Sequence, residues 1–139
     1  MNGLEQYPLF ARDKLRYADT DRQGHVNNAV FATFLETGRT ELVFQLELAE
    51  EAASFVIARL ELDFIQEITW PGEVEIGTAV LETGRSSLKL LQTIFQNGKP
   101  VAKAVSVVVQ VSNETRKSHP LSHKAQDLLK KYLRPASET

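Results

Sequence analysis

The chain has 139 residues, of which 42% are hydrophobic and 24% charged, with a formal net charge of -2. This composition excludes an intrinsically disordered chain, because enough apolar surface is available to bury a core, and the length suits one domain covering residues 1–139. The small net charge gives no broad electropositive surface for nucleic acid, and the absence of cysteine excludes disulfides and thiolate metal ligands.

The sequence carries no sign of secretion or membrane insertion. Its first residues, MNGLEQYPLF, lack the basic stretch and the apolar run of a secretory signal. No stretch approaches the roughly 20 apolar residues that a membrane-spanning helix requires. We therefore expect a soluble, cytoplasmic protein without a membrane partner.

Hydrophobic periodicity predicts a strand and then a long helix. Residues 9–17 alternate, so that one side of a strand carries Leu9, Ala11, Leu15 and Tyr17. After the polar residues 18–27, apolar residues recur at helical spacing from 28 to about 48, on a stripe formed by Phe31, Phe34, Leu35, Leu42 and Leu46. Gly38 lies in this stripe. Because a mid-helix glycine costs about 1 kcal/mol relative to alanine, we expect it to permit close packing against another layer.

Strands dominate the rest of the chain. In residues 55–65, FVIARLELDFI, strict alternation predicts a half-buried strand whose apolar face carries Val56, Ala58, Leu60, Leu62 and Phe64. Three further strands are predicted at 73–81, 87–96 and 101–112. The turns ETGR and QNGK between them contain the glycine that is typical of tight hairpins. A short polar helix at 122–133 completes the pattern.

This order of elements predicts an α+β fold, in which one long helix packs on an antiparallel sheet of about five strands. In the last strand, Ala102, Ala104 and Ser106 form a face of small side chains that suits close seating of a helix. The segment VAKAVSVVVQV is apolar on both faces, so a second subunit is expected to cover one of them. We expect a homodimer or a homotetramer.

The polar stretch ADTDRQGHVNN, residues 18–28, has three interpretations. In the first, Asn27 or Asn28 caps the helix and the other polar groups form a solvated loop. In the second, DTDRQG begins a calcium-binding EF-hand loop, which we reject because valine replaces the required glutamate at the twelfth position. In the third, Asp21 activates water or attacks a carbonyl carbon, while the free N–H groups of the helix N-terminus stabilise the developing oxyanion. Only this last interpretation accounts for Asp21, Gly24 and the helix start together.

The stretch RYADTDRQGHVNNAVFATFLETGR, residues 16–39, resembles the N-terminal signature of hot-dog-fold thioesterases of the 4-hydroxybenzoyl-CoA thioesterase type. That signature is an Arg/Tyr strand end, then D-x-D-x-x-G-H-V-N-N, then an aromatic-rich helix with E-x-x-R. The matching residues are Arg16, Tyr17, Asp19, Asp21, Gly24, His25, Val26, Asn27, Asn28, Glu36 and Arg39. The resemblance implies the hot-dog fold, in which a curved antiparallel sheet wraps around a long central helix.

The resemblance also implies hydrolysis of an acyl thioester, usually an acyl-CoA, to the free acid and CoA. By position, Asp21 corresponds to the catalytic carboxylate, acting as general base or nucleophile, and the N–H near Asn28 to the donor that polarises the carbonyl. His25 is expected to bond the substrate or orient Asp21, unless it is only a satisfied donor where the loop meets the helix. Gly24 lets the loop turn tightly beside the substrate.

Other residues are candidates for substrate binding. Asn27 caps the helix at the edge of the expected site. The side chains that either line the acyl pocket or pack in the core are Phe31, Phe34, Val56 and Phe64. Arg85 and Ser87 lie in the hairpin where related enzymes place groups for the CoA nucleotide, although a solvated hairpin explains them equally well. Glu36 and Arg39 are three residues apart and suit a helix-surface or interface ion pair.

Three alternatives stay open. Plant acyl-carrier-protein thioesterases carry a similar run with an asparagine where this chain has Gln23, so an acyl-carrier-protein substrate is one alternative. A hot-dog hydratase is another, although TWPGE lacks the histidine of that motif. The third is a non-catalytic acyl-CoA-binding module. No cofactor and no metal ion are expected, because Pro120 separates His119 from His123 and no third ligand is evident.

Overall fold

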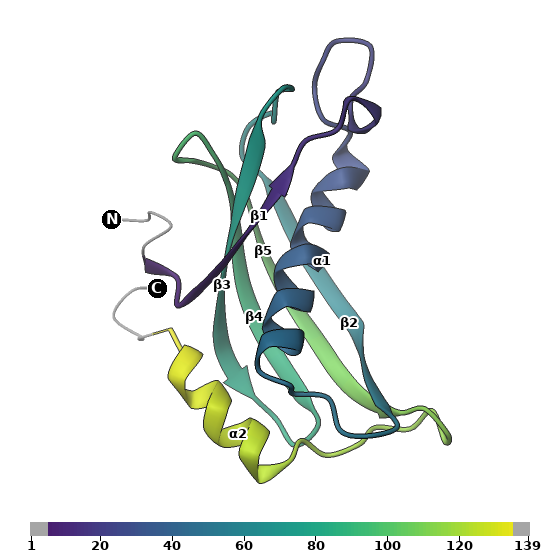
Figure 1. The fold of residues 1–139 in the computed structure, drawn as a ribbon. Helices are drawn as coiled ribbons and strands as arrows, with labels where there is room; N and C mark the ends of the chain where they lie inside the picture. The colour runs from purple at the N-terminus through teal and green to yellow at the C-terminus, as the bar shows by residue number, and fades with distance from the viewer. Residues whose placement is uncertain (1–5, 135–139) are drawn as a thin grey trace.

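A computed structural model describes residues 6–134, which form a five-stranded antiparallel sheet and two α-helices (Figure 1). The strands are β1 (Leu9–Lys14), β2 (Ala53–Phe64), β3 (Glu73–Thr83), β4 (Ser87–Gln96) and β5 (Lys99–Ser112). Their order in the sheet is β1-β3-β4-β5-β2. Helix α1 (Asn28–Gln45) lies along one face of the sheet, and α2 (His123–Leu129) lies at one end (Figure 1). The predicted helix-on-sheet arrangement is therefore confirmed.

The buried stripe of α1 faces the sheet. It consists of Phe31, Phe34, Leu35, Gly38 and Leu42. Ala102 and Ala104 of β5 share a core cluster with the phenylalanines of this stripe, and Ser106 of the same strand is buried as well. The small-residue face predicted for the last strand thus forms part of the core under the helix.

Helix α1 ends at Gln45, earlier than the predicted residue 48. Glu47 adopts a left-handed backbone with φ of 49°, and its N–H donates to the Phe44 carbonyl. The N–H of Leu48 then donates to the Val43 carbonyl at 3.1 Å. These two bonds form a Schellman-type cap, which satisfies terminal carbonyls and turns the chain out of the helix.

Gly38 marks a close approach of α1 to the sheet. A Cβ atom at this position would lie 2.6 Å from Gln92 Nε2 and 2.8 Å from Ile76 Cγ2. Gln92 is fully buried, and its Nε2 donates to the Leu35 carbonyl at 3.0 Å and to Thr78 Oγ1 at 3.1 Å. The glycine therefore makes room for a buried amide that ties the middle of the helix to the sheet, as its place in the apolar stripe predicts.

The predicted first strand is too long. β1 ends at Lys14, and residues Tyr17–Asp19 form a 3-10 turn instead of continuing the strand. Tyr17 is consequently 74% exposed, although alternation placed it with the buried side chains. Leu15, in contrast, is buried as expected.

A β-bulge corrects the pattern predicted for β2. The register with β5 shifts between Ile57 and Arg59, which leaves Ala58 as an extra residue. One inserted residue exchanges the two faces of a strand. Leu62 pairs with the buried Ala104 and shares its core-facing side, whereas Val56, before the bulge, pairs with Val109 and lies on the other face. The single apolar face predicted from Val56 to Phe64 is therefore wrong for Val56.

The hairpin turn at Asn97-Gly98 and the short C-terminal helix, both predicted from the sequence, are confirmed. Asn97 and Gly98 have φ of 54° and 78° and connect β4 to β5 by a two-residue hairpin turn. α2 starts after Ser122, whose Oγ accepts from the Ala125 N–H at 3.0 Å, and continues into a 3-10 turn, Lys130–Tyr132. None of the helices within residues 6–134 is long and apolar enough to cross a membrane.

The packing at Gly38 yields a stability prediction. Alanine usually stabilises a helix by about 1 kcal/mol relative to glycine, but here we expect Gly38→Ala to lower the free energy of unfolding by about 1–3 kcal/mol through overpacking. Urea unfolding monitored by circular dichroism measures the change. Thr33→Ala, at an exposed position of the same helix, is the control and should change stability little. A Gly38→Ala protein more stable than wild type would contradict the packing argument.

Candidate active site

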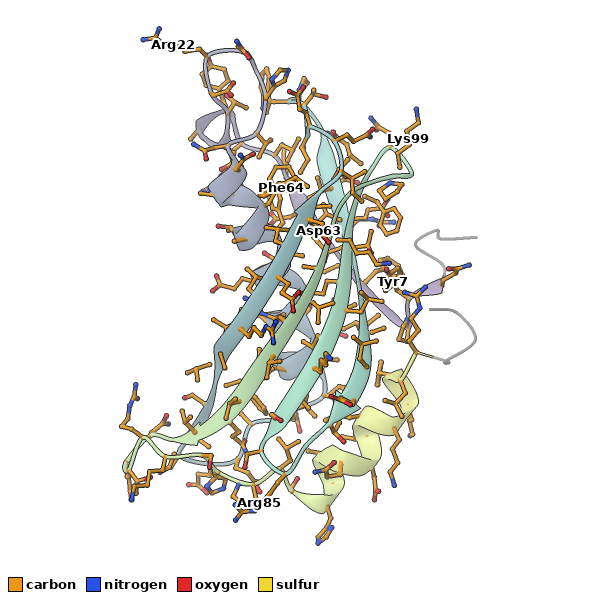
Figure 2. The ribbon with its side chains drawn as sticks, turned by 180° about the vertical axis from the view of Figure 1, so that it is seen from behind. Tyr7, Arg22, Asp63, Phe64, Arg85 and Lys99 are labelled. Carbon is orange, nitrogen blue, oxygen red and sulfur yellow. The ribbon has the colours of Figure 1, made fainter. Side chains whose placement is uncertain are left out.

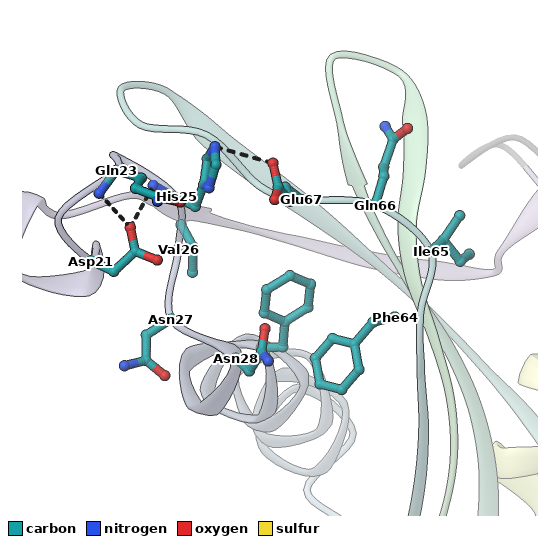
Figure 3. A pocket seen from close by; sticks show the side chains of 11 residues that line it. Asp21, Gln23, His25, Val26, Asn27, Asn28, Phe64, Ile65, Gln66 and Glu67 are labelled. Atoms are coloured by element: carbon teal, nitrogen blue, oxygen red, sulfur yellow. Dashed lines mark hydrogen bonds and ion pairs between the residues drawn. The ribbon is translucent and has the colours of Figure 1, made fainter.

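The loop before α1 is folded around the Asp21 carboxylate (Figure 3). Asp21 Oδ1 accepts from the N–H of Gln23 at 2.8 Å and from the N–H of His25 at 3.2 Å. Gly24 has φ of 79°, and no atom lies within 4 Å of a Cβ built on it, so the backbone conformation and not space demands glycine there. One carboxylate oxygen thus organises the loop, and Oδ2 stays available at an exposed position.

The first turn of α1 supplies the electropositive side of the site. Asn27 is the N-cap, and its Oδ1 accepts from the Ala29 N–H at 3.0 Å. Asn28 follows as the first helical residue, and no hydrogen-bond acceptor within residues 6–134 is found for its N–H. Such terminal N–H groups carry the positive end of the helix dipole and suit an anionic oxygen. The N-cap expected at Asn27 or Asn28 is therefore Asn27.

Asp19 has a structural role. It is only 4% exposed, and its carboxylate accepts from the backbone N–H and the guanidinium of Arg16, both at 2.9 Å. Burial by itself raises the pKa of Asp19, but the hydrogen bonds and the charge of Arg16 outweigh burial and lower this pKa below its ordinary value. The Asp19 carbonyl also accepts from the Asn27 N–H at 2.9 Å, so this residue joins the 3-10 turn after β1 to the helix start.

The segment after β2 forms the opposite wall. The N–H of Val26 donates to the Ile68 carbonyl at 2.8 Å, and the N–H of Trp70 donates to the Gly24 carbonyl at 3.3 Å. Next to these main-chain bonds, His25 Nε2 lies 3.1 Å from a carboxylate oxygen of Glu67 (Figure 3). The loop is therefore held to a segment more than 40 residues further along the chain.

A cavity of about 480 Å³ lies between the loop, the first turn of α1 and the segment after β2. It is lined by Asp21, Gln23, His25, Val26, Asn27, Asn28, Phe31, Phe64, Ile65, Gln66 and Glu67. Six residues predicted as site candidates meet here, namely Asp21, His25, Asn27, Asn28, Phe31 and Phe64. Gly24 lies in the loop between two of them. A carboxylate and a helix N-terminus that face the same cavity can act on the carbon and the oxygen of one carbonyl group.

Arg85 and Ser87 do not belong to this cavity. Arg85 and Arg22, the neighbour of Asp21, lie at opposite ends of the sheet (Figure 2). Arg85 is exposed, and its carbonyl accepts from the Leu121 N–H at 2.8 Å, next to the start of α2. Within one chain these two residues cannot contact a group bound beside Asp21.

Residues 65–67 are part of the site that sequence patterns missed. Ile65, Gln66 and Glu67 line the cavity because the chain leaves β2 towards the loop, and none of them belongs to a recognisable motif. The bridge pairing between His25 and Thr69 is what brings this segment to the site. Long-range pairing of this kind leaves no local pattern in the sequence.

Comparisons with known proteins agree with the geometry. A family model of the thioesterase-like superfamily matches residues 15–130. A thioesterase of Thermus thermophilus, solved in complex with coenzyme A and zinc, is 33% identical, with a TM-score of 0.79 over 91% of this chain and 95% of that one. The PA5185 protein of Pseudomonas aeruginosa PAO1 shares the fold, with 24% identity and a TM-score of 0.85 over 96% and 97% of the chains. The uncharacterized protein YsmA of Bacillus subtilis (strain 168) is 28% identical over 116 residues, which are 81% of this chain and 78% of that protein.

The lowered pKa of Asp19 predicts a pH-dependent contribution to stability. A carboxylate whose folded-state pKa lies below its ordinary value of 3.8 stabilises the fold above that pH and loses the contribution as the pH falls through the lowered pKa. We expect Asp19→Asn to lower the free energy of unfolding by about 1–3 kcal/mol at pH 7 and by less at pH 3, which lies below the ordinary pKa of 3.8. Urea unfolding at both pH values measures this. Asp127→Asn, an exposed carboxylate on α2, should show no such difference, and an equal loss at both pH values for Asp19→Asn would contradict the assignment.

Proposed function

This chain belongs to the thioesterase-like superfamily, and on that premise we propose that it is an acyl-CoA thioesterase, with Asp21 as the catalytic carboxylate. The observation that carries this proposal is the shared cavity, which is lined both by Asp21 and by Asn28, whose N–H has no acceptor within residues 6–134. The relative of known structure that was solved with coenzyme A supports CoA as the thiol portion of the substrate.

Asp21 supports two routes that reach the same products. As a general base, its carboxylate takes a proton from water while the water oxygen bonds to the thioester carbon. The tetrahedral intermediate then expels the CoA thiolate, which takes up a proton, and leaves the free acid. As a nucleophile, a carboxylate oxygen of Asp21 bonds to that carbon and expels the thiolate, and water then hydrolyses the mixed anhydride. Both routes use Oδ2, because Oδ1 is held by two N–H groups.

The first turn of α1 acts as the oxyanion site in either route. The Asn28 N–H points from the positive end of an 18-residue helix and has no competing acceptor within residues 6–134. Negative charge that develops on the carbonyl oxygen is stabilised by this donor and by the helix dipole. His25 has a positioning role. Its backbone N–H donates to Asp21 Oδ1, and its ring Nε2 lies next to the Glu67 carboxylate at the edge of the cavity.

The exposed surface of β2 supports a homodimer. β2 is an edge strand, and its apolar side chains Val56, Ile57 and Leu60 are 41%, 45% and 37% exposed. Unpaired edges with apolar side chains favour pairing with another strand. Arg39, which lines a cavity together with Ile57, has a buried Nη1 without a hydrogen-bond partner within residues 6–134, and burial lowers the pKa of its guanidinium although Glu36 opposes that change. A second copy paired along β2 would cover this edge and supply acceptors.

Such pairing also gives Arg85 and Ser87 a role. When two copies of β2 pair as antiparallel strands around a twofold axis, the axis exchanges the two ends of the sheet. The hairpin of the partner subunit then lies at the end of the sheet that carries Asp21. Arg85 of the partner subunit is thereby proposed to meet the CoA phosphates, whereas Arg85 of the same chain lies at the opposite end of the sheet from the Asp21 loop (Figure 2).

The catalytic proposal is tested with Asp21→Asn. Asparagine keeps the oxygen that accepts from Gln23 and His25, so the loop should stay folded, whereas proton transfer and nucleophilic attack are lost. We expect kcat for acyl-CoA hydrolysis to fall by about 10²–10⁴-fold with an unchanged melting temperature. Release of free thiol from short, medium, long and aromatic acyl-CoAs measures the rate, with Asp127→Asn as the control.

Other outcomes of that assay identify the alternatives. Full activity in Asp21→Asn would remove Asp21 from the mechanism. Acyl-CoA binding without thiol release in wild type would indicate a non-catalytic module. Release from acyl carrier protein alone would identify that carrier as the substrate, and hydration of an enoyl-CoA without thiol release would identify a hydratase.

The dimer proposal is tested with Ile57→Lys. A charged side chain in the middle of the β2 edge must lose its hydration on pairing, so we expect the dimer dissociation constant to rise by about tenfold or more, roughly 1.4 kcal/mol. Sedimentation velocity over a concentration series measures this change. Phe10→Lys, at a similarly exposed position on the opposite edge strand β1, should leave the dimer intact. A wild-type protein that sediments as a monomer would exclude the interface.

A further inference from the structure

Two aromatic side chains meet in the wall of the catalytic cavity. The rings of Phe31 and Phe64 have their centroids 5.0 Å apart at an interplanar angle of 68°, an edge-to-face contact. Phe31 comes from the first turns of α1 and is 2% exposed, whereas Phe64 ends β2 and is 51% exposed. Figure 3 shows the Phe64 ring beside the start of α1, facing the same space as Asn28. The contact therefore joins the helix to the sheet edge beside the reacting groups.

A second cavity, of about 270 Å³, lies further along α1 and β2. It is lined by the apolar side chains Val43, Phe55, Ile57, Leu90 and Val108 and by the polar side chains Glu36, Arg39 and Thr40. Leu62, half-buried against the core, lies on β2 between the two cavities. The Phe31–Phe64 contact thus lies between the catalytic cavity and a second cavity with a mixed apolar and polar lining.

We propose that the Phe31–Phe64 pair closes the acyl end of the catalytic cavity and restricts the substrate to short-chain or single-ring acyl groups. This inference rests on the proposed thioesterase function. At about 480 Å³, the catalytic cavity is near the small end of the range for small-molecule sites, and it must also hold the thioester and the adjoining part of the thiol. A long acyl chain has to displace the aromatic pair or extend into water, where its burial is lost.

Phe64 is the residue of the pair that sets the limit. Phe31 belongs to the core cluster with Phe34 and Leu35, so its ring cannot move without opening the core. Phe64 is less restrained within the single chain, since half of its surface is exposed at the end of an edge strand. Removal of the Phe64 ring extends the cavity towards Leu62 and the second cavity and leaves the loop around Asp21 untouched.

The experiment compares Phe64→Ala with Phe10→Ala. Both phenylalanines are 51% exposed, and both lie on edge strands, but Phe10 is on β1, away from the cavity. Values of kcat/KM are measured for straight-chain acyl-CoAs from about 2 to 16 carbons and for benzoyl-CoA. Because one methylene in an apolar pocket changes kcat/KM by about 10-fold or more, we expect wild type to prefer short and benzoyl substrates. Phe64→Ala should raise the ratio of the 10-carbon to the 4-carbon substrate at least tenfold, and Phe10→Ala should leave it unchanged.

The outcomes separate this inference from the proposed function. If wild type hydrolyses acyl-CoAs but favours long chains, or if Phe64→Ala leaves the ratio unchanged, the inference is overturned and the thioesterase proposal stands. If wild type hydrolyses no acyl-CoA, the proposed function fails. Calorimetry then measures the dissociation constants of non-hydrolysable thioether analogues of the same chain lengths. A tenfold shift of relative affinity towards the longer chains in Phe64→Ala supports the size limit. Equal relative affinities in both proteins, or no binding, overturn it. Phe64→Leu replaces Phe64→Ala if circular dichroism or sedimentation shows that the alanine variant is misfolded or has changed its assembly.

Discussion

Main-chain hydrogen bonds fix the position of the Asp21 carboxylate relative to the first turn of α1, and the chemistry proposed for the site depends on them. The loop is tied to the segment after β2 by the bond from Val26 to Ile68, and to the 3-10 turn after β1 by the bond from Asn27 to Asp19. Backbone bonds of this kind cost no side-chain entropy when a substrate arrives. A carboxylate and an oxyanion donor held in this way are preorganised, which is the condition under which positioning and electrostatic stabilisation lower a barrier.

The contact of α1 with the sheet is a second constraint on the position of the helix. Gln92 is buried beneath the helix and donates to a carbonyl in its middle, in the space that Gly38 leaves open. A helix anchored in this way cannot roll on the sheet without exposing the buried amide, which would lose its partners. The direction of the helix N-terminus, and with it the direction of the Asn28 N–H, follows from a glycine and a glutamine well away from the catalytic cavity.

Local patterns predicted those parts of the molecule that depend on local physics. The stripe on α1, the hairpin at Asn97-Gly98 and the grouping of Asp21 with the helix start all follow from short-range periodicity, turn chemistry and a compact motif. The failures have two physical origins. The end of β1 at Lys14 and the end of α1 at Gln45 are set by a local 3-10 turn and a local helix cap, which hydrophobic periodicity does not detect. The other failures arise from pairing with distant residues. The bulge at Ala58 is set by the register with β5, and Glu67 reaches the site only because its segment pairs with the loop. No rule that uses neighbouring residues alone can detect either.

The edge strand β2 links the proposed assembly to the proposed specificity. Phe64 ends this strand, and a second copy paired along β2 would lie next to it, so the ring that limits the acyl group also lies at the margin of the interface. The same twofold pairing exchanges the ends of the sheet and brings the Arg85 hairpin of one subunit to the Asp21 loop of the other. Recognition of the nucleotide, closure of the acyl pocket and burial of the apolar edge then become consequences of one interface. A chain that could not pair would keep its carboxylate and its helix terminus but lose much of the surface that selects a substrate. In the proposed dimer, assembly is therefore part of the active site's construction.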